Sequence, residues 1–315
     1  MVVGNKPGDV SGPPQTLLNW IRENPILYPF KGKYLNLGNH KLHYLDEGSG
    51  RPVFMIHGNP TWSFFYRNLI PALSKFMRVI VPDHVGCGLS DRPTDEQYSY
   101  TLESRLNDLD KLINHIAPTG KISLVVHDWG GMIGTSWAVR NASRIESIVF
   151  LNTAGFGLPQ GKPLPWTLKV CRSKIFGSLM VRGFNGFCLG AARYCAIKGL
   201  NSKVRAGFLS PYSSWKDRLA IFRFVQDIPI NPQHPSYEII EGTRSGLANL
   251  NDTPKIFCWG RHDFIFNDDF LAEWKKHFPN ADYNVFEDAG HYLLEDAPAP
   301  IIAKIQEFFM KHPGG

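Results

Sequence analysis

The sequence predicts an α/β fold: a mostly parallel sheet with helices on both faces and an inserted helical cap. Three observations predict it. Short apolar, β-branched runs alternate with helical patterns along the 315 residues. One gap between consecutive runs is about a hundred residues long, far more than a crossover between parallel strands needs. Finally, Asp128 ends one run at the point where a helical pattern begins, and in such folds that corner carries a reactive residue.

Six runs are expected to form buried parallel strands, because strands covered on both faces are apolar throughout instead of alternating. They are VFMIHG, RVIVPDH, ISLVVHD, IESIVFLNT, KIFCWG and ADYNVF, at 53–58, 78–84, 122–128, 145–153, 255–260 and 281–286. Before them, YLNLG and KLHYLDEG are typical of an antiparallel pair. We expect the sheet to begin with that pair.

The long gap divides the chain. We predict an N-terminal leader at 1–33, a core in two parts at 34–156 and 234–315, and a helical cap at 157–233. The cap would cover the carboxyl ends of the strands, where open α/β sheets bind ligands. The leader is polar and rich in Gly and Pro, and it lacks the basic-then-apolar profile of a signal peptide.

The net charge of +6 is concentrated in the predicted cap. Residues 157–226 hold twelve Lys or Arg and one acid, Asp217, with aromatic residues between them. Such a segment can contact a membrane surface, an acidic partner or an enzyme assembly. A solvated basic face over an apolar inner face explains the pattern more simply and is favoured. Nucleic acid is not expected as a partner because no binding motif accompanies the charge. No run is long enough for a membrane helix.

The five cysteines are odd in number and unclustered, with no CxxC or Cys/His metal spacing. This usage favours a reduced, cytoplasmic location and small core side chains, and it predicts no metal site. They are Cys87, Cys171, Cys188, Cys195 and Cys258.

Asp128 is the candidate nucleophile. It stands between ISLVVHD and the helical pattern WGGMIGTSWAVR, in which Gly130 and Gly131 allow close strand–helix packing. Val126 occupies a place that usually holds a small residue, which suits an aspartate nucleophile better than a serine. A carboxylate is ionised at neutral pH and attacks saturated carbon without a base. An Asp after a strand is more often a helix cap, but the flanking sequence favours the nucleophile.

The run ending in HGNPTW is expected to supply donors opposite the nucleophile. One backbone N–H follows such a strand and a second comes from the residue after the nucleophile, which here are Asn59 and Trp129. Both residues also carry side-chain N–H donors, suited to a halide or a departing carboxylate. Alone, Asn59 is most simply a turn residue before Pro60; its pairing with Trp129 favours the functional role.

The candidate base is His291, in DAGHYLLEDAP after the last run. Its order after Asp128 matches the order nucleophile, acid, histidine of this kind of site. The acid must follow a late strand, and Asp263 in KIFCWGRHD does so, 28 residues before His291. The competing place after IVFLNT holds Asn152 and Thr153, which are not acids.

Together these motifs resemble the haloalkane-dehalogenase-type α/β hydrolases, and among them most closely the subgroup of the cis-β-lactone decarboxylases of bacterial long-chain olefin biosynthesis. The segments that carry the resemblance span about residues 34 to 296 and include the cap. They are YLDEGSG, HGNPTWSFFYRNL, VIVPDHVGCGLSDRP, YSYTLESRLNDLDKLI, VVHDWGGMIG, LNTAGFGLP, PYSSWKDRLAIFRFVQDIPI and DAGHYLLED.

The resemblance implies the α/β-hydrolase fold, no cofactor and a small hydrophobic substrate. It assigns Asp128 as nucleophile, His291 as base and Asp263 as acid, with Asn59 and Trp129 as leaving-group stabilisers. Epoxide hydrolases share HDWGG but normally have an aromatic residue where Asn59 stands, which counts against that activity.

Three functions compete. The favoured one is decarboxylation of cis-β-lactones with long alkyl chains to cis-alkenes and CO2. For that reaction we expect Asp128 to attack the ring carbon that bears the alkyl oxygen; attack at the lactone carbonyl, through an anhydride, is the alternative. The second function is hydrolysis of haloalkanes to alcohol and halide. The third is a catalytically silent receptor or assembly subunit, which intact Asp128, Asp263 and His291 argue against.

Overall fold

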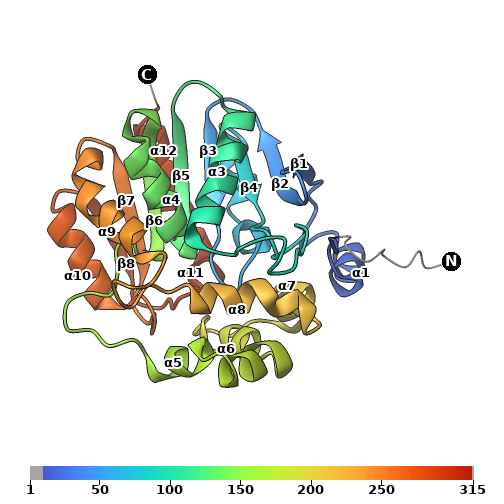
Figure 1. Cartoon of the computed structure of the whole chain (residues 1–315). Helices are drawn as coiled ribbons and strands as arrows, with labels where there is room; N and C mark the ends of the chain where they lie inside the picture. The colour runs from blue at the N-terminus through green and yellow to red at the C-terminus, as the bar shows by residue number, and fades with distance from the viewer. Residues whose placement is uncertain (1–9, 314–315) are drawn as a thin grey trace.

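A computed structural model describes residues 10–313 of the chain. Eight strands form a single sheet in the order β1-β2-β4-β3-β5-β6-β7-β8 (Figure 1). The strands are β1 (Lys33–Asn36), β2 (Lys41–Gly48), β3 (Pro52–Ile56), β4 (Arg78–Pro82), β5 (Ile122–Asp128), β6 (Ile145–Thr153), β7 (Lys255–Gly260) and β8 (Asp282–Phe286).

The strand directions confirm the predicted fold class. β1 pairs antiparallel with β2, β2 pairs antiparallel with β4, and every pairing from β4 through β3, β5, β6 and β7 to β8 is parallel. All six predicted parallel runs form strands, and the antiparallel start predicted before them is present. The carboxyl ends of the parallel strands therefore meet at one edge of the sheet, where the predicted site residues follow β3, β5, β7 and β8.

Helices pack on both faces of the sheet. The α-helices are α1 (Gln15–Glu23), α2 (Ile70–Leu73), α3 (Leu102–Ile116), α4 (Trp129–Arg140), α5 (Trp166–Arg172), α6 (Gly186–Tyr194), α7 (Ser202–Leu209), α8 (Leu219–Gln226), α9 (Tyr237–Gly246), α10 (Asp268–His277), α11 (Leu293–Asp296) and α12 (Pro298–Lys311). The shorter turns are η1 (Ser63–Tyr66), η2 (Ala142–Arg144), η3 (Ser178–Gly183), η4 (Ser210–Tyr212), η5 (Lys216–Arg218) and η6 (Leu247–Leu250).

The core has two parts, one on each face of the sheet. Successive side chains of a strand point to opposite faces, and β3 illustrates this: Phe54 and Ile56 join one buried cluster while Val53 and Met55 join the other. The first cluster includes apolar side chains of α3, α4 and α10, and the second includes those of α12 and the loop after β3. Because both faces are buried, the strands are apolar throughout, as their sequences indicate.

Between β6 and β7 the chain leaves the sheet and forms α5 to α9. We call residues 157–233, which contain α5 to α8, the insert. Figure 1 shows α5 and α6 lying beyond α8 at one end of the sheet. The next helix, α9, instead contacts α4 on a face of the sheet. Several large apolar side chains of the insert are exposed, among them Trp166 and Phe176.

Residues 1–9 of the predicted leader lie outside the described residues, whereas the rest of it contains α1. Leu17 and Trp20 of α1 are buried, and the indole N–H of Trp20 donates to the carbonyl of Lys203 in α7. Among residues 10–313, none of the helices combines the length and apolar character needed to cross a bilayer.

Candidate active site

Asp128 forms the corner between β5 and α4. It is the last residue of β5, and α4 begins at Trp129. Its backbone has φ 51° and ψ −126°, a positive φ that residues with a side chain rarely adopt. It occupies the N-cap position of α4, yet its side chain makes no capping hydrogen bond. The backbone of Asp128 is therefore strained, and no capping hydrogen bond to α4 compensates for the strain. Strained residues of this kind are typical of functional sites.

Two glycines let the surrounding backbone approach this corner. A Cβ built on Gly58 would lie 2.1 Å from Asp128 Oδ1, and one built on Gly130 would lie 1.9 Å from the carbonyl oxygen of Ile56. Neither neighbour can move away easily, because one is the candidate nucleophile and the other is backbone of β3. Gly130 thus allows the close strand–helix packing expected from the sequence.

The Asp128 carboxylate is buried and only partly satisfied. Oδ1 accepts a hydrogen bond from the backbone N–H of Asn59 at 2.6 Å, and Oδ2 lies 3.6 Å from Nε2 of His291. Burial raises the pKa of Asp128, while His291 and the backbone N–H groups of Asn59 and Trp129 oppose that rise. The predicted donors thus meet at the predicted nucleophile.

His291 and Asp263 form a close buried pair. Nδ1 of His291 lies 2.7 Å from Asp263 Oδ2, while Oδ1 of Asp263 accepts the backbone N–H groups of Ile265 and Phe266 at 2.7 and 3.0 Å. An ionised Asp263 needs the imidazole proton on Nδ1, which leaves Nε2 facing Asp128. Burial lowers the pKa of His291, but Asp263 and then Asp128 outweigh that effect, so the pKa is raised.

The side chains of Asn59 and Trp129 differ in their partners. Nδ2 of Asn59 donates to the carbonyl of Ile221 in α8 at 3.3 Å, and its Oδ1 is buried without a hydrogen-bond partner. The insert therefore accepts one of the two N–H groups of the Asn59 side-chain amide, and the second N–H remains for a ligand. The Trp129 ring packs against Phe224 of α8, with ring centroids 5.4 Å apart. Contacts from α8 thus orient both residues.

Sequence reasoning missed two residues that hold the site together. Asn152 and Thr153 were considered only as a place where an acid was lacking. Asn152 accepts the N–H of Gly260 at 2.6 Å and donates to its carbonyl at 3.1 Å, joining β6 to the end of β7 before Asp263. The Thr153 hydroxyl donates to the carbonyl of Asp128 at 2.5 Å. The sequence did contain a signal for these roles, because Asn152 and Thr153 are polar residues at the carboxyl end of an otherwise apolar strand.

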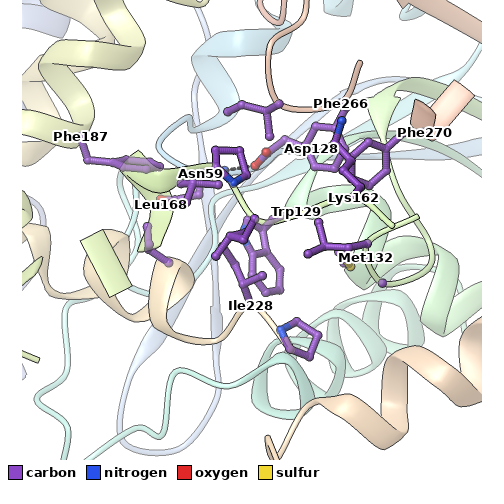
Figure 2. A pocket seen from close by; sticks show the side chains of 17 residues that line it. Asn59, Asp128, Trp129, Met132, Lys162, Leu168, Phe187, Ile228, Phe266 and Phe270 are labelled. Atoms are coloured by element: carbon purple, nitrogen blue, oxygen red, sulfur yellow. Dashed lines mark hydrogen bonds between the residues drawn. The ribbon is translucent and has the colours of Figure 1, made fainter. Parts of the chain in front are cut away.

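Asp128 faces an apolar cavity of about 70 Å³, which we call the inner chamber (Figure 2). Its polar lining residues include Asp128, Asn59 and Lys162, and the rest of the lining is almost entirely apolar. Those residues are Trp129, Met132, Gly157, Leu158, Leu164, Pro165, Leu168, Phe187, Val225, Ile228, Pro229, Ile265, Phe266 and Phe270. Figure 2 shows the Asp128 carboxylate beside Asn59, with Trp129 and Met132 nearby. A greasy ligand with one reactive polar group fits such a chamber.

Comparison with known proteins shows the family to which the chain belongs. The family model described as the alpha/beta hydrolase fold matches residues 51–172 and 199–298. The chain is 45% identical to a cis-3-alkyl-4-alkyloxetan-2-one decarboxylase of Shewanella oneidensis, covering 90% of this chain and 89% of that one. It is 40% identical to a protein of the same name from Xanthomonas campestris, covering 86% and 93%.

More distant relatives are haloalkane dehalogenases. Haloalkane dehalogenase 2 of Mycobacterium tuberculosis is 28% identical, covering 91% of this chain and 97% of that one. Among solved structures, the haloalkane dehalogenase DatA of Agrobacterium tumefaciens C58 superimposes with a TM-score of 0.80 at 22% identity, covering 89% of this chain and 96% of that one. This last likeness concerns the fold.

Proposed function

The chain is an enzyme of the α/β-hydrolase fold family, in the group that includes the cis-3-alkyl-4-alkyloxetan-2-one decarboxylases, and from that membership we propose that it decarboxylates cis-β-lactones carrying two alkyl chains. The products are a cis-alkene and CO2. The observation that carries the proposal is the buried Asp128 carboxylate at the wall of an apolar chamber, 3.6 Å from a histidine that is itself paired to an aspartate. Relatives at 45% and 40% identity support the choice of substrate.

In the first step, Asp128 attacks the ring carbon that bears the alkyl oxygen. Asn59 N–H holds Oδ1, so Oδ2 is the oxygen that forms the new bond. The carbon–oxygen bond of the four-membered ring breaks with inversion, which releases ring strain. The electron pair of that bond stays on oxygen, giving a free carboxylate and an alkyl ester of Asp128. Trp129 and Asn59 stabilise that carboxylate through their side-chain N–H groups.

In the second step, the carbon–carbon bond to the carboxylate breaks and CO2 leaves. Its electron pair forms the double bond while the ester bond to Asp128 breaks, and the aspartate regains its negative charge. Inversion followed by anti elimination converts a cis lactone into a cis alkene. The step consumes no water and transfers no proton, so electrons and atoms balance without a further reactant.

The His291–Asp263 pair is not required to activate water on this route. His291 favours the ionised form of Asp128 that attacks, whereas the Asp263 carboxylate opposes it. If Asp128 instead attacked the lactone carbonyl, the product would be an anhydride, and His291 would be needed for turnover. Loss of His291 therefore separates the two routes.

Haloalkane hydrolysis is the second candidate, supported by the dehalogenase relatives at 28% identity. Asp128 would displace a halide held by Asn59 and Trp129. His291 would then activate a water that attacks the ester carbonyl, whose oxygen is the one held by Asn59 N–H. This route differs from lactone cleavage in that it depends on water and on a neutral His291.

Direct comparison of the two substrates tests the proposal. The purified protein is incubated with a cis-dialkyl β-lactone or a 1-bromoalkane, and alkene, CO2, alcohol and bromide are measured. We expect kcat/KM for the lactone to exceed that for the bromoalkane by at least a hundredfold, with a cis-alkene as the product. A lactone hydrolysed to its hydroxy acid, or left unconsumed while bromide is released, would contradict the proposal.

The proposed substrate gives the chain a place in bacterial long-chain olefin synthesis, in the cytoplasm.

Twelve basic residues and one acid in residues 157–226 offer a surface for an acidic partner enzyme. Co-sedimentation with the enzyme that forms the β-lactone tests that association. We expect a complex that weakens as salt is raised; no complex at low salt would contradict it.

A further inference from the structure

A second apolar cavity lies beside the inner chamber. This outer chamber has a volume of about 320 Å³ and reaches His291 at its deep end. Besides the residues it shares with the inner chamber, it is lined by Pro60, Trp166, Thr167, Val170, Cys171, Met180, Gly186, Gly190, Ala191, Tyr194, Cys195, Phe264 and His291. Its walls come mainly from α5 and α6 of the insert.

The two chambers meet at the candidate catalytic residues. Both are lined by Asn59, Pro165, Leu168, Phe187 and Ile265. Asp128 lines the inner chamber and His291 lines the outer one, and these two side chains are 3.6 Å apart. The reacting atoms of a substrate attacked by Asp128 therefore lie where the chambers join.

The outer chamber opens toward solvent. The α6 residues that line it are spaced as one helical stripe and include Gly186, Gly190 and Ala191, whose small size leaves the space between α5 and α6 unfilled. Trp166 and Tyr194 also line it, and they are 75% and 64% exposed. These two exposed residues mark the solvent side of the outer chamber.

An ion pair forms part of the wall of the inner chamber. Lys162 lines it, and its ammonium forms a 2.7 Å ion pair with Asp269 of α10, with only 14% of the Lys162 side chain exposed. The same ammonium lies 5.5 Å from the centre of the Phe270 ring, another wall residue. At about 70 Å³, the inner chamber is the smaller of the two, against about 320 Å³ for the outer chamber.

We propose that the two alkyl chains of the substrate occupy separate chambers, one bounded in length by Lys162 and the other extending out between α5 and α6. This inference rests on the proposed function, because a 3,4-dialkyl β-lactone carries its chains on adjacent ring carbons and so directs them to two sides of the reacting centre. The enzyme then tolerates long chains at one ring position and discriminates against them at the other.

Two series of cis-β-lactones test this asymmetry. One series keeps a methyl group at C3 and lengthens the chain at C4, and the other does the reverse. For the wild-type enzyme, kcat/KM in one series should fall at least tenfold once the chain exceeds the length that the inner chamber holds. In the other series it should stay level or rise as the chain grows.

Two variants should act on different chambers. Lys162→Ala opens the inner chamber and should move the length limit to longer chains in the restricted series only. Gly190→Phe narrows the outer chamber and should cut kcat/KM for long chains at least tenfold in the tolerant series only. A Cβ at Gly190 meets no atom within 4 Å, so the helix accepts the substitution.

Matched controls separate chamber effects from damage to the fold. Asp269→Asn removes the ion pair but keeps the Lys162 side chain at the wall, so the limit should barely move. Gly242→Phe is the control for Gly190→Phe. It introduces the same side chain in α9, away from both chambers, and a Cβ at Gly242 also meets no atom within 4 Å. The 3,4-dimethyl lactone reaches neither chamber end, and its kcat/KM should be unchanged in the two control variants, Asp269→Asn and Gly242→Phe.

The outcomes distinguish failure of the two-chamber assignment from failure of the proposed function. If both series show the same length dependence, or if each variant alters both series equally, the two-chamber assignment is wrong and the outer chamber is only an entrance. If no lactone of either series is consumed, the proposed function itself fails.

Discussion

Two buried aspartates follow parallel strands of this sheet, and each has a histidine beside it. Asp83 follows β4 and lies 2.8 Å from Nδ1 of His43, while Asp128 ends β5 and lies 3.6 Å from Nε2 of His291. Both carboxylates are almost inaccessible to water. In outline the two pairs are alike, yet only Asp128 lines a chamber.

The difference lies in how fully each carboxylate is bonded. Asp83 accepts the N–H groups of Ser63 and Leu89 at 2.6 and 2.9 Å in addition to its histidine. Burial opposes its charge, but His43 and the other donors outweigh that, and the pKa of Asp83 is lowered. For Asp128 burial prevails and the pKa is raised. A saturated carboxylate stabilises the fold, whereas an under-bonded one beside a cavity is available to react.

The largest effect should come from removing the under-bonded carboxylate. Asp128→Ala should lower kcat for lactone and bromoalkane alike by about 10⁴-fold or more, since nothing else in the chamber can replace the nucleophile. Its unfolding free energy should stay level or rise, because a buried, poorly hydrogen-bonded carboxylate is lost while the backbone conformation stays the same. Steady-state kinetics and urea unfolding measure both; residual activity within tenfold of wild type would contradict the assignment.

The reverse pattern is expected at the saturated pair. Asp83→Ala leaves buried N–H groups of Ser63, Leu89 and His43 without an acceptor, and should cost about 3–5 kcal/mol of unfolding free energy. The fraction that remains folded should keep its kcat. Urea unfolding with active-site titration checks this. A stable variant with no turnover would mean that Asp83 takes part in the chemistry and that the contrast between the pairs is wrong.

A smaller effect should follow removal of one donor at the reactive pair. Trp129→Phe keeps a ring against Phe224 but removes the indole N–H, and should lower kcat roughly a hundredfold. Trp259→Phe is the matched control, because that indole N–H is buried without a partner and lies outside both chambers. Equal losses in both variants would indicate a packing effect in place of leaving-group stabilisation.

The smallest effect is a separation of pH profiles. Asp128 must be ionised for either reaction, so both are lost as the pH falls through its pKa, which is raised above that of an ordinary aspartate. Bromoalkane turnover also needs neutral His291, whose pKa is raised above 6.5. The kcat for the bromoalkane should therefore fall at a higher pH than the kcat for the lactone. Coincident profiles would place His291 in both reactions.

The sequence was sufficient for the sheet and for the residues at its carboxyl edge. Strands buried on both faces are apolar throughout, so their positions are visible as runs, and the corner at Asp128 follows from a run that meets a helical pattern. Asp263 followed from exclusion, since Asn152 and Thr153 are not acids. The order of the residues along the chain then brought His291 into the same group.

Other features depend on distances that a sequence does not contain. Asp83 and His43 are 40 residues apart and meet only because β2 and β4 pair. The roles of Asn152 and Thr153 depend on which backbone groups face them. The two chambers arise from how α5 and α6 pack over the sheet, so no local pattern predicts their volumes or the position of Lys162 at the end of one of them.

The central claim is that Asp128 forms a covalent bond to carbon, and His291→Ala tests it most directly. That variant, incubated with a long-chain 1-bromoalkane, should gain the mass of one alkyl group, and peptide mapping should locate the group on Asp128. It should keep part of its lactone turnover, because that route needs no water. An unmodified protein, or an alkyl group on another residue, would contradict the claim; equal loss of both activities would instead favour attack at the lactone carbonyl.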